Sequence, residues 1–232
     1  MFKRGQVISY LDMCKAEGVN LQRGMNYRLG REYSVILMSL RPSAPYADRV
    51  EDDGKVLIYE GHDAPRRPTT PNPKLVDQPT RNPGGNPTQN QLFFNAAERY
   101  KLGNNQTELV KVYEKVRSGI WVYNGFFKLV DAWKEKTEGR TVFKFRLILV
   151  ADEKPGIHKQ FGTDIEHDRL IPSAVKREVW QRDKGRCVTC GRQDNLHFDH
   201  IIPYSKGGSS LVARNIQLLC ARHNIAKKDR IE

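Results

Sequence analysis

The last fifth of the chain concentrates residues that bind metal ions, in the stretches CVTCGRQDNLHFDHIIPYSKGG and NIQLLCARHNIAKK. Two residues separate Cys187 from Cys190, and Cys220 and His223 repeat that spacing. Two such pairs can surround one tetrahedral zinc ion, and a closed four-ligand set is structural because no position stays open for substrate. We therefore expect one zinc ion that helps a small domain to fold, rather than three unrelated buried thiols. Cys14, far upstream, is expected to be an apolar side chain.

Four polar residues of the same region are not used by this zinc set: Asp199, His200, Asn215 and Asn224. At these positions residues 171–230 resemble the HNH nuclease family, which has a ββα-metal fold. The resemblance rests on IPSAVKREVWQRDKGRCVTCG, DHIIPYSKGG, NIQLLC and the closing Asn224-x-x-Lys227. It implies that His200 is the general base, that Asp199 binds the catalytic divalent ion and that Asn215 holds the loop after the histidine. The third motif position falls on Asn224, which makes an HNN variant with an amide oxygen as a weaker metal ligand.

The chemistry of these residue types agrees with that assignment. A neutral imidazole can accept a proton from water near pH 7, and Mg²⁺ held by few protein oxygens keeps positions open for phosphate and water. Asp199 and His200 are adjacent on an expected strand, so their side chains point to opposite sides. Basic residues nearby are expected to face phosphates, although a solvated basic helix face is the alternative; they are Arg214, Arg222, Lys227, Lys228 and Arg230.

The elements that must position these groups can be placed from the sequence pattern. Strand-forming residues dominate residues 32–40, 54–61, 108–116, 119–133 and 140–150, and a Pro- and Gly-rich loop covers 64–91. A short helix is expected at 89–103 and a polar linker at 151–170. Residues 171–187 predict a helix capped by Ser173. Two short strands around 196–202, a Gly-rich loop and a final helix from about Leu211 should follow.

The first part of the chain carries EYSVILMS, PYADRVEDDGKVLIYEGHD, VDQPT, GIWVYNGFFKLVDAW and VFKFRL in that order. Over about residues 20–150 this series resembles the SRA (YDG) domain family, with Tyr123-Asn124-Gly125 at the position of the family letters. The resemblance implies a PUA-like curved β-barrel that flips a modified cytosine out of duplex DNA. It implies that Tyr46 and Tyr59 are the walls of the base pocket. We expect Asp48, with Glu60 as second choice, to be the acidic partner of the cytosine. For the two tyrosines the alternative is that they are ordinary β-sheet aromatics.

Composition limits the partners. The chain has 232 residues with 39 Lys and Arg against 27 Asp and Glu, for a net charge of +12, and both parts are basic. Such a charge favours nucleic acid as a ligand. No apolar run approaches the roughly 20 residues that span a bilayer, and there is no signal-peptide pattern, so we expect a cytoplasmic, prokaryotic protein with reduced thiols and no membrane.

These observations predict an α+β protein with an SRA-like recognition domain at 1–150, a linker at 151–170 and a zinc-stabilised HNH nuclease domain at 171–232. We expect a modification-dependent DNA endonuclease that recognises 5-methylcytosine or 5-hydroxymethylcytosine and hydrolyses nearby phosphodiester bonds, in defence against modified foreign DNA. A double-strand break suggests a homodimer. The alternatives are a non-catalytic reader of modified DNA with a structural zinc module, and a nuclease specific for unmodified sequence.

Overall fold

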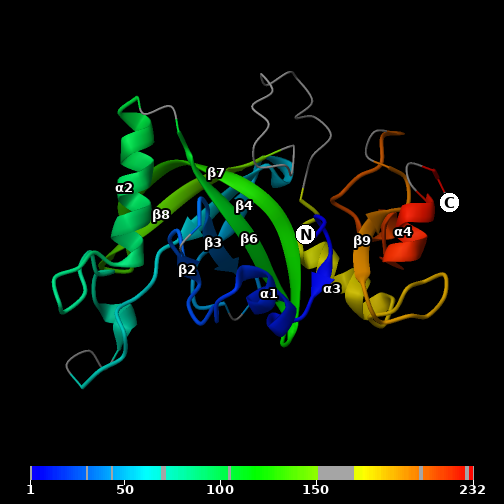
Figure 1. Ribbon diagram of the computed structural model, residues 1–232, viewed down its shortest axis with the longest axis horizontal. Helices are drawn as coiled ribbons and strands as arrows, with labels where there is room; N and C mark the ends of the chain where they lie inside the picture. Colours follow the sequence, from blue (N-terminus) through cyan, green and yellow to red (C-terminus); the bar gives the residue numbers. More distant parts are fainter. Residues whose placement is uncertain are drawn as a thin grey trace.

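The computed structural model describes residues 2–29, 31–42, 44–68, 72–103, 106–150, 170–203, 206–227 and 230–231. They form a first lobe, residues 2–150, and a second lobe, residues 170–231, side by side along the longest axis (Figure 1). The predicted linker 151–170 lies outside the described residues except for Leu170. The domain boundaries therefore stay a prediction.

The first lobe is built around one curved sheet. Its strands are β1 (Val7–Ile8), β2 (Met25–Asn26), β3 (Ser34–Met38), β4 (Arg49–Glu51), β5 (Val56–Glu60), β6 (Glu108–Arg117), β7 (Ile120–Thr137) and β8 (Arg140–Leu149). The order is β2-β3-β6-β7-β8-β5-β4, with β1 paired to β7 off this path. Only β3 and β6 run parallel; the other described pairs are antiparallel. Within the described chain, β2 and β4 are the two edge strands of this order. They are not paired with each other, so the curved sheet is not closed into a barrel by strand pairing.

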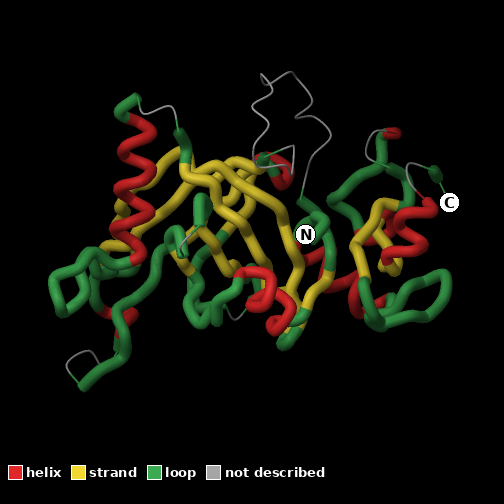
Figure 2. The backbone as a smooth tube through the Cα atoms, in the orientation of Figure 1, coloured by secondary structure: helices red, strands yellow, loops and turns green. Residues whose placement is uncertain are grey.

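Two α-helices cover the sheet of the first lobe. The helix α1 (Tyr10–Glu17) begins at Ser9, whose side chain accepts from the Asp12 amide, and ends at Gly18 with φ +65°. The helix α2 (Gln89–Lys101) begins at Thr88, whose hydroxyl caps it. Figure 2 places α2 at the end of the sheet away from the second lobe. Its buried Phe93, Ala96 and Ala97 recur at helical spacing and join the main core of the sheet.

The second lobe is small and depends on short elements. The helix α3 (Ser173–Arg182) leads to the first cysteine pair, and β9 (Leu196–His200) pairs antiparallel with β10 (Ile216–Cys220) before α4 (Ala221–Lys227). A 3-10 turn, Ala213–Asn215, precedes β10. The α+β class predicted from the sequence is confirmed, with a two-stranded antiparallel ribbon and a following helix in the second lobe.

The structure corrects two predictions of local structure. The cap of α3 is Pro172, not Ser173: Ser173 is the first helical residue, and its hydroxyl is buried against Glu114 instead of capping the helix. The final helix does not begin near Leu211, because β10 comes first and α4 starts only at Ala221. The apolar run of β10 was ambiguous, since a short buried strand and a buried helix segment share the same pattern.

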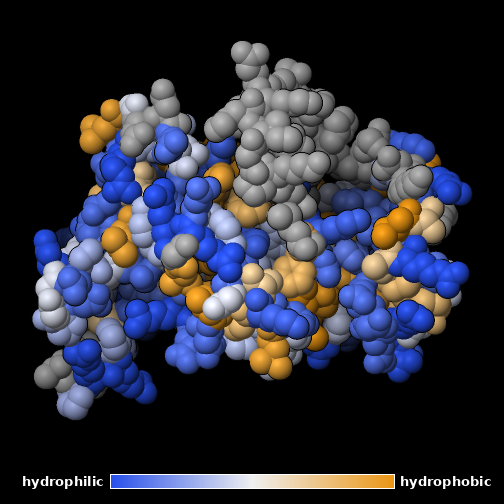
Figure 3. Space-filling view, in the orientation of Figure 1, coloured by the Kyte–Doolittle hydropathy of each residue, from blue (hydrophilic) through white to orange (hydrophobic). Residues whose placement is uncertain are grey.

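None of the helices in the described part of the chain combines the length and apolar character that a bilayer crossing requires. On the face drawn in Figure 3, hydrophilic side chains predominate.

Candidate functional site

The four predicted zinc ligands lie together in the second lobe. Cys187 and Cys190 follow α3, Cys220 ends β10 and His223 lies in the first turn of α4. Their ligand atoms all lie within 4.8 Å of one another. His223 Nδ1 is 3.3 Å from the sulfurs of both Cys187 and Cys220, and the Cys190 and Cys220 sulfurs are 3.8 Å apart. This cluster has the size and composition of a Cys3His metal site.

The chemistry of this donor set fits a metal such as zinc. Burial raises the pKa of the Cys187 thiol, but backbone hydrogen bonds at the cluster outweigh it and bring the pKa down to about 6. A thiolate is the form that binds metal. Because Cys187 and Cys220 are buried among apolar side chains of the second lobe, a bound ion would join α3, β10 and α4 into one unit.

The predicted general base ends strand β9. His200 Nε2 is 2.8 Å from the hydroxyl oxygen of Ser210, which is buried. With its proton on Nε2 toward Ser210, the ring leaves Nδ1 free to accept a proton from water. Burial lowers the pKa of His200, the Asp199 carboxylate opposes that shift and the Lys227 ammonium adds to it. A neutral imidazole is the form that a general base requires.

The loop that follows His200 is held by Asn215. The Asn215 side chain accepts from the Ile202 amide at 2.9 Å and donates to the carbonyls of Ile202 and Ser209 at 3.0 Å each. The space is tight at Gly208, where a Cβ atom would lie 1.8 Å from the Ile202 carbonyl oxygen. This is the arrangement that the predicted role of Asn215 requires. Ser210 was missed, because nothing in Gly-Gly-Ser-Ser distinguishes its hydroxyl from that of Ser209.

Asp199 lies beside a buried lysine. Its Oδ2 is 2.9 Å from Lys227 Nζ, and the Lys227 side chain is 1% exposed. Lys227 also donates to the His200 carbonyl. The prediction that Lys227 faces DNA phosphates is therefore wrong: the helical register of α4 turns this residue onto β9, where its charge balances Asp199. Asn224, one turn earlier, shares that face of the helix.

Polar atoms on the Asp199 face of the ribbon are incompletely paired. Asp199 Oδ2 contacts the Lys227 ammonium without a hydrogen bond of standard geometry, and Nε2 of Gln217 has no hydrogen bond. Gln217 lies directly opposite Asp199 in the β9–β10 register, so both side chains project from one face of the ribbon. Carboxylate and amide oxygens are the ligands that hard divalent cations prefer, so Asp199 and Asn224 would hold such an ion in the place that the Lys227 ammonium takes here.

Three of the other residues predicted to contact phosphates are on the surface. Arg214, Arg222 and Arg230 are exposed, as contacts to DNA require. Lys228 lies outside the described residues.

Three of the four predicted base-pocket residues line one cavity of about 660 Å³ in the first lobe. Tyr46, Asp48 and Tyr59 all contribute to its wall, together with strand residues of β3, β6 and β7 and with Arg23 and Arg41. The cavity is large enough for a cytosine base. Tyr59 itself is 1% exposed and belongs to the main core, so it is both a wall and a packing residue.

His62 is a cavity residue that the sequence did not reveal. Its ring stacks on Tyr46, with 5.3 Å between ring centroids and 18° between planes, and its Nε2 is 3.0 Å from the Tyr59 hydroxyl. Asn90 clamps its backbone, accepting from the His62 amide at 2.8 Å and donating to the carbonyl at 2.9 Å. Burial lowers the pKa of His62 to about 4, so the ring is neutral at pH 7. Only its place two residues after Glu60 in Glu60-Gly61-His62 hinted at such a position.

The two acidic candidates differ in what they contact. Asp48 accepts from the amides of Glu60 at 3.0 Å and Ser39 at 3.4 Å, and burial raises its pKa to about 7. Glu60 pairs with Lys144 at 2.8 Å and accepts from the Ala47 amide. Glu60 is 4% exposed and is absent from the cavity lining, so its carboxylate balances buried lysine charge and is not available to a base. The second-choice prediction of Glu60 is thus wrong.

Comparison with known proteins gives a family match for the second lobe and a relative by sequence. Residues 187–230 match the HNH endonuclease family. The chain is 31% identical over 118 residues to the histone-lysine N-methyltransferase family member SUVH2 of Arabidopsis thaliana, which is half of this chain but only 16% of that protein. The family match confirms the HNH part of the resemblance predicted from the sequence.

Two solved structures are similar in fold. A complex of the SUVH5 SRA domain with methylated CHH DNA aligns with 66% of this chain and 91% of that one, at 23% identity and a TM-score of 0.45. The SUVH5 SRA domain bound to fully hydroxymethylated CG DNA aligns with 63% of this chain and 88% of that one, at 25% identity and a TM-score of 0.44. At such TM-scores the likeness says nothing further about function.

Proposed function

We propose that this chain is a DNA endonuclease that binds a flipped, modified cytosine in the first lobe and hydrolyses a nearby phosphodiester with the second. The arrangement of His200, Ser210 and Asn215 carries the proposal. It presents a neutral imidazole at the end of a strand and fixes the loop that follows it. That geometry, in a segment that matches HNH endonucleases, supports hydrolysis rather than a purely structural zinc module.

The hydrolytic step would use these residues as follows. His200 accepts a proton from the attacking water. The hydrogen bond to the Ser210 hydroxyl holds the His200 ring in the orientation for that transfer. A divalent ion such as Mg²⁺, held by Asp199 and Asn224, would supply a positive charge at the scissile phosphate. Arg214 and Arg222 would contact neighbouring phosphates, which orients the strand without reading sequence.

Recognition is assigned to the cavity of the first lobe. A flipped cytosine would stack on the aromatic walls, and the Asp48 carboxylate would accept from its amino group. The 5-methylcytosine or 5-hydroxymethylcytosine preference, like defence against modified foreign DNA in a prokaryotic cytoplasm, is part of this proposal. Because one HNH centre cuts one strand, a double-strand break would require two copies of the chain.

The test is digestion of matched duplexes that carry cytosine, 5-methylcytosine or 5-hydroxymethylcytosine, with and without Mg²⁺. We expect Mg²⁺-dependent cutting of the modified duplexes only. Tyr46→Ala should reduce the preference for modified DNA and leave weak, salt-sensitive binding, since stacking is worth roughly 1–3 kcal/mol per base. Tyr46 is the better position to change than Tyr59, whose truncation would also open the core. Equal cutting of all three duplexes would refute the proposal that the first lobe recognises a modified cytosine.

A second candidate is a non-catalytic reader of modified DNA. The Lys227 ammonium beside Asp199 favours it, because a lysine that stays there competes with a divalent cation. Measurement of Mn²⁺ binding by the wild type and by Lys227→Met separates the two. Binding by the wild type that Asp199→Asn abolishes supports the nuclease, whereas binding seen only in Lys227→Met supports the reader.

A further inference from the structure

A buried polar network joins the two lobes. Lys176 on α3 donates to Glu114 Oε2 of β6 at 2.6 Å and to Asn124 Oδ1 of β7 at 2.8 Å. Asn124 donates to the same Glu114 oxygen at 2.9 Å, and Ser173 donates to the other. The exposed fractions are 2% for Glu114 and Lys176, 0% for Asn124 and 6% for Ser173. We call these four residues the interlobe network.

The interlobe network explains why the chain has Tyr123-Asn124-Gly125 where the SRA family letters have Tyr-Asp-Gly. An aspartate at 124 would place two carboxylates against the single ammonium of Lys176. The amide of Asn124 instead donates to Glu114 and accepts from Lys176, so every charge in the network is compensated. The Lys176 ammonium also lowers the pKa of Glu114 against the opposing effect of burial.

Apolar contacts surround the network. Val116 and Val122 of the first-lobe sheet belong to one buried cluster with Ile171, with Val175 and Val179 of α3, and with the core of the second lobe. The two lobes therefore share one apolar core at this junction and do not meet as two separately covered surfaces. Separating them would expose part of the core that the zinc-binding region uses.

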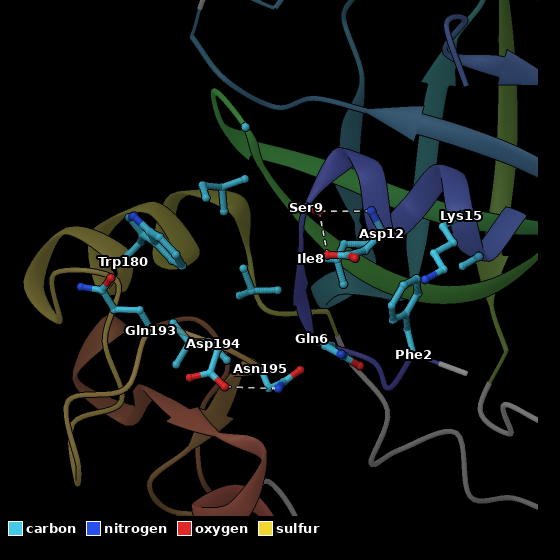
Figure 4. A pocket seen from close by; sticks show the side chains of 15 residues that line it. Phe2, Gln6, Ile8, Ser9, Asp12, Lys15, Trp180, Gln193, Asp194 and Asn195 are labelled. Atoms are coloured by element: carbon cyan, nitrogen blue, oxygen red, sulfur yellow. Dashed lines mark hydrogen bonds between the residues drawn. The ribbon is translucent and has the colours of Figure 1, made fainter. Parts of the chain in front are cut away.

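The N-terminal segment also connects the lobes. Gly5 donates to the Tyr123 carbonyl at 2.9 Å and accepts from the Phe198 amide at 3.1 Å, so it bridges β7 and β9. Gln6 forms a β-bridge with His197. Figure 4 shows this segment at the junction, where side chains near α1 face Trp180 and Asn195 of the second lobe across a groove of about 620 Å³.

The same strands line the base cavity. Lys115 follows Glu114 on β6 and Trp121 precedes Asn124 on β7, and both contribute to the cavity wall. The β9 strand that Gly5 contacts carries Asp199 and His200 at its end. The interlobe network therefore joins strands that line the cavity to α3, which packs against the Ala213–Asn215 turn and β10 of the second lobe.

We infer that Glu114, Asn124 and Lys176 are positioning residues that fix the nuclease centre relative to the base cavity, and so fix the distance from the modified base to the cut. This inference rests on the proposed function. A buried ion pair adds little net stability, but its geometry specifies one arrangement of its partners. A nuclease lobe that was not docked on the first lobe would cut at many distances, whereas the docked lobe reaches a narrow set of bonds.

The test compares the wild type with the double variant Glu114→Gln/Lys176→Met, which removes both charges together and leaves no buried charge unpaired. The matched control is Glu178→Gln, an exposed position on the same helix. The substrate is a duplex with one modified cytosine, labelled at either end so that each cut position is read. Zinc content and affinity for the duplex are measured on every variant.

We expect the wild type and Glu178→Gln to cut a narrow group of adjacent bonds at a fixed distance. The double variant should spread its cuts over a broad ladder while its zinc content and affinity stay unchanged. A loss of stability alone would lower the yield of cuts without changing their positions. Scattered cuts by the wild type, or an unchanged pattern in the double variant, would overturn the inference.

Calorimetric unfolding gives a second measurement that needs no cleavage. We expect a single transition for the wild type and two for the double variant, because the lobes would no longer unfold together. If the wild type binds modified DNA and does not cut, the nuclease proposal fails and calorimetry alone decides the positioning role. Two unfolding transitions in the wild type, or a single one in the double variant, would then show that the interlobe network does not make the two lobes unfold together.

Discussion

At the scale of single residues, His200 and Ser210 make the most direct test of the chemistry. A general base contributes typically 10²–10⁴-fold, so His200→Ala should lower single-turnover cleavage by about that factor and leave binding of modified DNA unchanged. Ser210→Ala removes one hydrogen bond to the ring, worth about 1 kcal/mol or roughly fivefold in rate. Cleavage by His200→Ala at the wild-type rate would mean that another group is the base.

Asp48 links recognition to stability at the same scale. Burial raises the pKa of its folded-state carboxyl from 3.8 to about 7, so the folded protein holds a proton that the unfolded chain loses. Wild-type stability should therefore fall as pH rises from about 4 to 7 and level off above that. Each pKa unit corresponds to about 1.4 kcal/mol, and solvent at the cavity mouth reduces the full effect.

The variant Asp48→Asn removes this titration and should lose preference for modified DNA, because an amide is a poorer acceptor for the cytosine amino group. The difference in free energy of unfolding, variant minus wild type, should rise by about 2 kcal/mol when the pH is raised from 5 to 8, because only the wild type loses stability over that range. Denaturant unfolding at the two pH values measures the difference, with the exposed Asp194→Asn as control. A stability difference between variant and wild type that does not change with pH would show that the folded state does not raise the pKa of Asp48.

At the scale of elements, the loop between β9 and β10 depends on a glycine. A Cβ at Gly208 would lie 1.8 Å from the Ile202 carbonyl oxygen and 2.8 Å from Asn215 Nδ2, so Gly208→Ala must push the loop away from Asn215. A displacement of about 1 Å can cost 10²-fold in rate. We expect such a loss with zinc content retained. Gly84→Ala, whose Cβ meets nothing within 4 Å, should cut normally. Full activity of Gly208→Ala would show that the loop can relax without moving His200.

The elements also show where sequence reasoning succeeded. The five strands β3, β5, β6, β7 and β8 and the helix α2 follow from runs of β-branched and aromatic residues and from helical spacing, because each signal is local. The zinc ligands followed from spacing alone, since two residues between ligands fit the metal geometry wherever the fold brings the pairs together.

The predictions that failed depend on long-range contacts. Lys227 appeared to belong to an exposed basic run, but the register of α4 against β9 buries it beside Asp199. Glu60 follows an aromatic wall residue in the sequence, yet its partner Lys144 is 84 residues away. His62, Ser210 and the interlobe network were invisible for the same reason, because no local pattern reports a contact between distant strands and helices.

At the scale of the whole molecule, removal of zinc should affect both lobes. Cys187→Ala should abolish stoichiometric zinc and the folded state of the second lobe, because structural zinc supplies about 10–16 kcal/mol in small domains. The first lobe keeps its own core around Phe93, Phe127 and Phe145, so it should remain folded and still bind modified DNA. Its transition should move to lower temperature, since Val116 and Val122 lose the cover of the second lobe. Elemental analysis and calorimetry measure the two effects, with Cys14→Ala as the control that retains zinc. A wild-type protein purified without zinc, or a Cys187→Ala variant that keeps it, would contradict the assignment of these four ligands.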